Sequence, residues 1–215
     1  MIDVLYEDED ILAVNKPEGL VAVAERRRLD LSLFEMLCAE RGEKLYIVHR
    51  IDRETSGVIV FARNAEAHRQ LNRQFETRSV AKVYLALVHG IISDDRGEID
   101  KPLRQFGSGR VAVDAQRGKA SITEFRVLER LEAFTLVEAR PHTGRRHQIR
   151  VHLYSIGHPI VGDPLYGDRA IQRSYSRLML HARRLTLEQP RGKRLTIEAP
   201  IPQSFQKILT AAAQF

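Results

Sequence analysis

The sequence of 215 residues contains a single cysteine, Cys38, and no long uncharged run. One thiol forms neither an internal disulfide nor a zinc cluster, which is typical of a protein from a reducing cytoplasm. The longest uncharged stretch, Val83 to Ser93, is about half as long as a membrane span. Five of the first ten residues are acidic, so the start lacks the basic leader of a signal peptide. The sequence therefore predicts a cytoplasmic protein that does not enter a membrane.

The composition is that of a globular protein, with 43% hydrophobic and 29% charged residues. A chain of this length buries roughly 70% of its extended surface, so it needs no metal or disulfide for stability. Internal repeats, low-complexity runs and linkers rich in Pro, Gly or Ser are also missing. We therefore expect one domain spanning residues 1–215.

Positive charge is concentrated in one part of the chain. The net charge is +6 and the pI is near 9.7. The first 25 residues hold seven acids and one lysine, whereas the stretch from Glu138 to Arg184 holds nine arginines and three acids. Arginine suits phosphate and stacks on bases better than lysine does. A polyanion, first of all nucleic acid, is the expected partner, and a merely solvated basic surface is the alternative.

The apolar pattern predicts an α+β fold with a central, mostly antiparallel mixed β-sheet flanked by helices and loops, because many strand-like runs are joined by short connections. One such connection is the hairpin Leu131 to Phe134. The expected strands are Val4–Leu5, Ile11–Asn15, Leu45–Val48, Val58–Ala62, Lys82–His89, Ile122–Leu131, Phe134–Ala139, Leu178–Leu187 and Arg194–Ala199. Three helices are expected. The first has Asp30 as its cap and ends at Gly42, and the second has Asn64 as its cap before the apolar residues Ala67, Leu71 and Phe75. The third closes the chain, with its apolar face on Phe205, Ile208, Leu209 and Ala212.

A further helix is expected to open at Thr143 and Gly144. Ile149, Leu153 and Ile156 then form its buried stripe. A basic and aromatic face able to hold phosphate and stack on a base is predicted opposite that stripe, and it consists of Arg146, His147, Arg150 and Tyr154.

Several common site motifs are incomplete or absent. The triplet Gly118 to Ala120 lacks the first glycine of a phosphate loop and its Ser or Thr. His142, His147 and His152 recur every five residues, a step that carries side chains well round a helix, and no HExxH or CxxC accompanies them. No Ser lies in a GxSxG elbow. We therefore expect neither a metal site nor a hydrolase triad.

The polar loop HRIDRETSG, His49 to Gly57, lies between two apolar runs. An aspartate and an arginine in a loop are often only turn residues. This loop nevertheless resembles that of the RluA-type pseudouridine synthases, as do five other segments in the same order and spacing. These segments are NKPEG (15–19), KVYLALVHG (82–90), GRRHQIRVHL (144–153), GHPIVGDPLYG (157–167) and LMLHARRLTL (178–187). Ile51 replaces the family's usual Leu, which is a swap of similar volume.

The resemblance implies an isomerase that detaches uracil from ribose in RNA, rotates it and rejoins it through C5, without metal or cofactor. Asp52 matches the family's catalytic aspartate, which acts on the sugar as a nucleophile at C1′ or as a base at C2′. Arg150 matches the arginine that pairs with it and favours its ionised form. Tyr84 matches the tyrosine that packs on uracil and takes part in removing the C5 proton. Without the resemblance, Tyr84 is a core aromatic residue.

The resemblance also implies that the target uridine leaves the base stack. Arg50 matches the family's intruding residue, which takes the place of the flipped base. Arg145, Arg146 and His147 are expected to contact phosphate. Lys82 is either an RNA contact or a solvated strand residue. Leu180 either lines the uracil pocket or belongs to the core.

The expected protein is a single catalytic domain, acting as a monomer on a stem-loop of ribosomal or transfer RNA, with no DNA partner. The chain begins almost at NKPEG, so no N-terminal S4 RNA-binding domain is expected. The insert Phe106 to Ala120 is either a mobile loop that grips RNA or a plain exposed connection.

Two other functions compete with this interpretation. An RNA-binding module without chemistry would not place the carboxylate of Asp52 towards phosphate. A nucleosidase normally uses two positioned carboxylates, and only Glu54 lies near Asp52 in the sequence.

Overall fold

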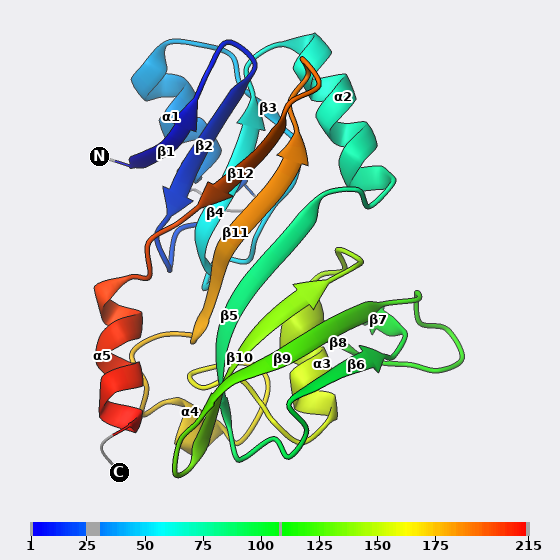
Figure 1. Ribbon diagram of the computed structural model, residues 1–215, viewed down its shortest axis with the longest axis vertical. Coiled ribbons are helices and arrows are strands. Elements are labelled where there is room, and N and C mark those ends of the chain that lie inside the picture. The colour runs from blue at the N-terminus through cyan, green and yellow to red at the C-terminus, as the bar shows by residue number, and fades with distance from the viewer. Residues whose placement is uncertain (1, 25–30, 108, 214–215) are drawn as a thin grey trace. The chain divides into compact units, whose positions relative to one another are not determined.

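The computed structural model describes residues 2–24, 31–107 and 109–213, which form an α+β structure of two units (Figure 1). Unit 1 comprises Met1–Lys82 and Ala182–Pro200, and unit 2 comprises Val83–His181 and Ile201–Phe215. Each unit thus joins two separate stretches of the chain. That residues 1–215 act as one catalytic domain remains a prediction.

Unit 1 is built around strand β4, whose residues are all buried because both of its faces are covered. Val58 and Val60 pack with residues of helix α2, while Ile59 and Phe61 pack with residues of helix α1. This follows from the alternation of side chains along a strand. The strand order is β1-β2-β4-β11, with β3 also paired to β4 and β12 to β11. The elements are β1 (Asp3–Glu7), β2 (Ile11–Lys16), α1 (Leu33–Arg41), β3 (Tyr46–Ile47), β4 (Ser56–Ala62), α2 (Ala65–Glu76), most of β11 (Leu180–Glu188) and β12 (Arg194–Glu198).

The helix caps of unit 1 confirm one prediction and correct another. The Asn64 side chain accepts a hydrogen bond from the backbone N–H of Ala67, as predicted for the start of α2. The cap of α1 is Ser32, which forms a reciprocal capping box with Glu35. Asp30, the predicted cap, lies outside the described residues. The αL residue Gly42 ends α1 as expected.

Unit 2 contains the antiparallel strand order β5-β10-β9-β6. The predicted hairpin between β9 and β10 is closed by the Leu131 N–H, which donates to the Phe134 carbonyl over 2.8 Å. Helix α3 packs against β9 and β10 (Figure 1), and α5 packs its apolar face on the same core. The elements are β5 (Ala81–His89), β6 (Arg96–Asp100), β7 (Leu103–Gln105), β8 (Val111–Val113), β9 (Ile122–Arg130), β10 (Phe134–Pro141), α3 (Gln148–Ser155), α4 (Arg169–Gln172) and α5 (Gln203–Ala212).

Three strands and one helix of unit 2 were not predicted. Strand β6 has one buried apolar residue, Ile99, so alternation gives almost no signal. Strands β7 and β8 have three residues each and form a separate hairpin, and α4 has four residues. Strand β8 lies inside the insert that was expected to be a loop, and its Val111 is only 2% exposed. The insert is therefore partly a packed strand.

Candidate active site

Asp52 lies in unit 1, in the loop between β3 and β4, and is half-buried. The N–H of Thr55 donates to the backbone carbonyl of Asp52 over 3.1 Å, which closes a four-residue turn. Arg50, two residues earlier in the same loop, is exposed. The loop therefore holds the two residues that were predicted to act on the sugar and to replace the flipped base.

A buried ammonium group ties this loop to the NKPEG segment. Lys16 is fully buried, and its Nζ donates to the carbonyls of Pro17, Leu20 and Arg53 over 2.8, 2.7 and 3.0 Å. The N–H of Gly19 also donates to the Arg53 carbonyl over 2.9 Å, and the Arg53 side chain donates back to the Gly19 carbonyl. Two motifs whose first residues are 34 positions apart in the sequence are thus hydrogen-bonded to each other beside Asp52.

His49 fastens the start of the loop to β4. The N–H of Val60 donates to its Nε2 over 3.0 Å, and its ring stacks on Phe75 with centroids 4.6 Å apart. Desolvation lowers the pKa of His49 to about 3, and the charge of Lys82 acts in the same direction. His49 is therefore neutral at physiological pH and serves as a fixed hydrogen-bond acceptor.

The glycine that ends the HRIDRETSG motif is required by close backbone approach. Gly57 has φ of 114°, and a Cβ there would lie 2.2 Å from the carbonyl oxygen of Ala182 on β11. Only glycine allows β4 and β11 to come together at this point.

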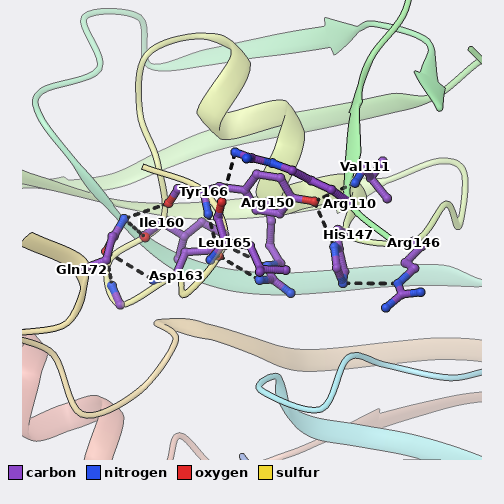
Figure 2. Close-up of polar contacts among 11 residues, drawn as sticks. Arg110, Val111, Arg146, His147, Arg150, Ile160, Asp163, Leu165, Tyr166 and Gln172 are labelled. Atoms are coloured by element: carbon purple, nitrogen blue, oxygen red, sulfur yellow. Dashed lines mark hydrogen bonds and ion pairs between the residues drawn. The ribbon is translucent and has the colours of Figure 1, made fainter. Parts of the chain in front are cut away.

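Arg150 lies in unit 2 on α3 and is 1% exposed. Its Nε and Nη2 donate to the two carboxylate oxygens of Asp163, each over 2.8 Å (Figure 2). This bidentate pair joins α3 to the GHPIVGDPLYG segment. Asp163 was not identified in the sequence, where an aspartate between glycine and proline is typical of a turn.

The prediction of an exposed basic face on this helix is wrong. The helix begins at Gln148 rather than at Thr143, so Arg146 and His147 precede it. Every residue from Gln148 to Leu153 is buried, because the Asp163 segment covers the side of α3 that was expected to face solvent. Of the four predicted residues of that face, Tyr154 and Arg146 are exposed.

Gln172 of α4 holds the Asp163 segment in its conformation. Its Oε1 accepts from the N–H of Gly162 over 2.6 Å and from that of Asp163 over 3.2 Å. Its Nε2 donates to the carbonyls of Ile160 and Tyr166 (Figure 2). The N–H groups of Leu165 and Tyr166 also donate to the Asp163 carboxylate. The anion that faces Arg150 is thus positioned by backbone groups.

The residues before α3 take different positions. Arg145 is half-buried, and its N–H donates to the Gln148 side chain over 3.0 Å. His147 is 8% exposed with φ of 54°, and its Nδ1 shares a hydrogen bond of 2.9 Å with the Tyr166 hydroxyl. Contacts of Arg145, Arg146 and His147 with phosphate remain predictions.

The other predicted site residues are divided between the units. Lys82, at the end of the first stretch of unit 1, is half-buried, and burial, together with the charge of Arg78, lowers its pKa. Tyr84 of β5 lies opposite Ala139 in β10 and is half-buried against the core of unit 2. Leu180 is 3% exposed in that core. The structure gathers Arg50 with Asp52 in one loop, and Arg145 to Arg150 in one segment. Their joint action remains a prediction.

The three evenly spaced histidines have separate partners. His142 lies on the surface with its Nε2 2.9 Å from Glu124. His152 is buried and bridges the Thr123 hydroxyl and the Lys101 carbonyl. Within residues 2–24, 31–107 and 109–213, no three His, Cys, Asp or Glu side chains are arranged to hold a metal ion. In the same part of the chain, no helix is both long and apolar enough to span a membrane.

Comparison with known proteins defines the class. A model of the family described as RNA pseudouridylate synthase matches residues 10–155. An uncharacterized RNA pseudouridine synthase of Bacillus subtilis, YlyB, is 40% identical over 97% of this chain and 72% of its own length. Ribosomal large subunit pseudouridine synthase D of Pseudomonas aeruginosa is 39% identical over 99% of this chain and 72% of its own. The dual-specificity RNA pseudouridine synthase RluA of Vibrio cholerae is 38% identical, with 97% and 87% covered.

The structure agrees with these matches. The human RNA pseudouridylate synthase domain containing 1 superimposes with a TM-score of 0.81 at 30% identity, covering 99% of this chain and 94% of its own. The chain belongs to the RNA pseudouridylate synthase family, and it is an enzyme that isomerises uridine in RNA to pseudouridine. The predicted family, fold class and type of reaction are confirmed.

Proposed function

We propose that residues 1–215 form a single catalytic domain that converts a specific uridine in a stem-loop of large-subunit ribosomal RNA, with Asp52 as the catalytic carboxylate. The observation that carries this proposal is the set of hydrogen bonds that hold the Asp52 loop in place. Its turn is held by the buried Lys16 and by paired hydrogen bonds with Gly19, within a motif typical of the family. A reacting group needs such a rigid support.

The proposed reaction exchanges one glycosidic bond for another. Asp52 acts on the ribose, either by attack at C1′ or by proton abstraction at C2′, and the N1–C1′ bond breaks. The uracil turns, the C5–C1′ bond forms, and the proton lost from C5 is matched by one gained at N1. Tyr84 packs on the ring and assists removal of the C5 proton. Leu180 lines the pocket for the base.

Arg150 is proposed to pair with Asp52 during this reaction. Asp163 already accepts hydrogen bonds from Nε and Nη2 of this guanidinium. A guanidinium that is already oriented by one carboxylate loses little freedom when it meets a second.

The RNA partner is proposed to be held by cationic side chains, with Arg50 in the place of the flipped base and Lys82, Arg145 and Arg146 against phosphates. His147 is the weaker candidate, because its ring is buried. The name of the Pseudomonas aeruginosa relative refers to the ribosomal large subunit, which favours ribosomal RNA as the first target. We expect the enzyme to act as a monomer in the cytoplasm.

Mapping of pseudouridines in total RNA tests the target. Cells without this gene should lack pseudouridine at one or a few ribosomal positions, and the wild-type gene should restore them. A missing pseudouridine confined to transfer RNA would overturn the ribosomal assignment.

Replacement of Asp52 tests the chemistry. Asp52→Asn should lower turnover by four decades or more, about 5 kcal/mol of barrier, while RNA affinity stays equal or improves because one negative charge is removed. Glu54→Gln, on the same loop, is the control and should keep most of the activity. More than a few per cent of wild-type activity in Asp52→Asn would exclude the carboxylate role, and an equal loss in Glu54→Gln would favour a carboxylate pair.

A further inference from the structure

Tyr166 contacts two parts of unit 2 that are separate in the sequence, the start of α3 and the hairpin of β7 and β8. It lies in the GHPIVGDPLYG segment and is 2% exposed. Figure 2 shows it between Arg150 of α3, His147 just before α3, and Arg110 and Val111 of the hairpin formed by β7 and β8. None of the roles assigned above uses this residue.

The hydroxyl of Tyr166 links the hairpin to the start of α3. It accepts a hydrogen bond from the N–H of Val111 over 3.2 Å and shares one of 2.9 Å with Nδ1 of His147. Burial raises the pKa of Tyr166, so the hydroxyl keeps its proton at physiological pH. The αL conformation of His147 is uncommon for a residue with a side chain and needs a support of this kind.

The ring of Tyr166 supports two guanidinium groups. The central carbon of Arg150 lies 5.3 Å from the ring centroid, and that of Arg110 lies 5.6 Å from it. Both distances are typical of cation–π attraction. Asp163 holds one edge of the Arg150 guanidinium, and the Tyr166 ring contacts the same guanidinium from another side.

The hairpin has a buried and an exposed part. Leu103 and Val111 form a small apolar cluster with Val151 of α3 and Tyr166. Phe106, directly after β7, is 41% exposed, and the Arg104 guanidinium lies 5.1 Å from its ring centroid. An exposed aromatic ring beside arginines suits contact with RNA bases and phosphates.

We propose that Tyr166 is a positioning residue that couples this hairpin to Arg150. Its hydroxyl fixes the hairpin and His147, and its ring fixes the guanidinium of Arg150. This inference rests on the proposed function, since it takes RNA as the substrate of the hairpin and Arg150 as the partner of Asp52. The two parts of the side chain therefore serve different steps, RNA binding and chemistry.

Two variants separate these parts. Tyr166→Phe keeps the ring and removes the hydroxyl with its two hydrogen bonds, so KM for a stem-loop RNA should rise about fivefold while kcat changes less than about twofold. Tyr166→Leu also removes the ring, so kcat should in addition fall by about ten- to thirtyfold. A merely structural residue would change KM and kcat in parallel with the melting temperature.

Val151→Ala is the matched control. It removes buried apolar volume from the same cluster and leaves the hydroxyl, the ring and both guanidinium groups in place. It should lower the melting temperature with kcat and KM close to wild type. Tyr166→Phe decides the question even where Tyr166→Leu does not fold, because unchanged KM in a folded Tyr166→Phe protein overturns the proposal. A Tyr166→Phe protein in which KM rises and kcat falls together, in step with a lower melting temperature, overturns it as well.

Asp52→Asn in the same assay keeps this test apart from the proposed function. A fully active Asp52→Asn protein refutes the proposed mechanism, whatever Tyr166 does. An inactive Asp52→Asn protein with no split between kcat and KM at Tyr166 refutes the coupling alone.

Discussion

The two units bury positive charge in different ways. In unit 1 the ammonium of Lys16 is surrounded by three backbone carbonyls, which are neutral dipoles. In unit 2 the guanidinium of Arg150 meets the full negative charge of Asp163 in a bidentate pair. A compact ammonium suits carbonyls that converge from several directions, whereas a planar fork suits a carboxylate. Loss of Asp163 therefore removes a full negative charge from beside a buried cation in unit 2, whereas loss of the Lys16 ammonium takes one donor from three carbonyls in unit 1.

The largest effect on stability is expected from breaking the pair in unit 2. Asp163→Asn removes the carboxylate that holds the buried guanidinium of Arg150 and should lower the free energy of unfolding by about 3–5 kcal/mol. Urea unfolding measures this loss. Asp168→Asn, directly after the same segment, is the control and should be near neutral, because asparagine also caps a helix. An unchanged urea midpoint in Asp163→Asn would show that the pair adds little to stability.

Removal of the ammonium in unit 1 should cost less. Lys16→Met keeps the length of the side chain, and it leaves three carbonyls with fewer donors, so we expect a loss of about 2–3 kcal/mol. Since the Arg53 carbonyl also belongs to the Asp52 loop, kcat should fall more than the RNA affinity. A loss equal to that of Asp163→Asn in the same urea series would contradict the distinction between dipoles and a full counter-charge.

A smaller effect concerns pH and His49. Because the pKa of His49 is lowered to about 3 in the folded state, the unfolded chain takes up a proton at a higher pH than the folded protein does. The free energy of unfolding therefore falls as the pH drops from about 6.5 towards 3. His49→Phe keeps the stacking on Phe75 and removes the titration. Its unfolding free energy should be lower at pH 7 and fall less steeply with acid, by up to about 1 kcal/mol per pH unit. Equal slopes for wild type and His49→Phe, with the exposed His142→Gln as control, would refute this prediction.

The smallest effect on stability is expected at Arg50, because Arg50 is exposed whereas Arg150 is buried. Arg50→Ala should leave the melting temperature unchanged. Its rate should fall about ten- to hundredfold on a uridine in a stem-loop, and much less on the same uridine in an unstructured oligomer, because only the stacked base needs a substitute. Steady-state rates on both RNAs measure the difference. An equal loss on both would make Arg50 a general electrostatic contact.

Local patterns were sufficient for much of the fold. The cap at Asn64, the αL glycine at position 42 and the alternation in β9 and β10 each depend on neighbouring residues, and each was predicted. Short elements such as β7, β8 and α4 have too few residues for a periodic signal, so they were missed. Ser32 rather than Asp30 caps α1, because both residue types suit a cap and only the backbone selects one.

The sequence alone determined the family, the type of reaction and the motif that contains Arg50 and Asp52, since these depend on residue types in a fixed order. Tertiary structure alone decided that Lys16 supports the Asp52 loop, that Asp163 holds Arg150, and that Tyr166 joins the hairpin to α3. Each of these contacts joins residues from different segments of the chain. A helical period reports only which residues share a side of one helix, so it predicted an exposed Arg150, while the covering segment with Asp163 determines its burial.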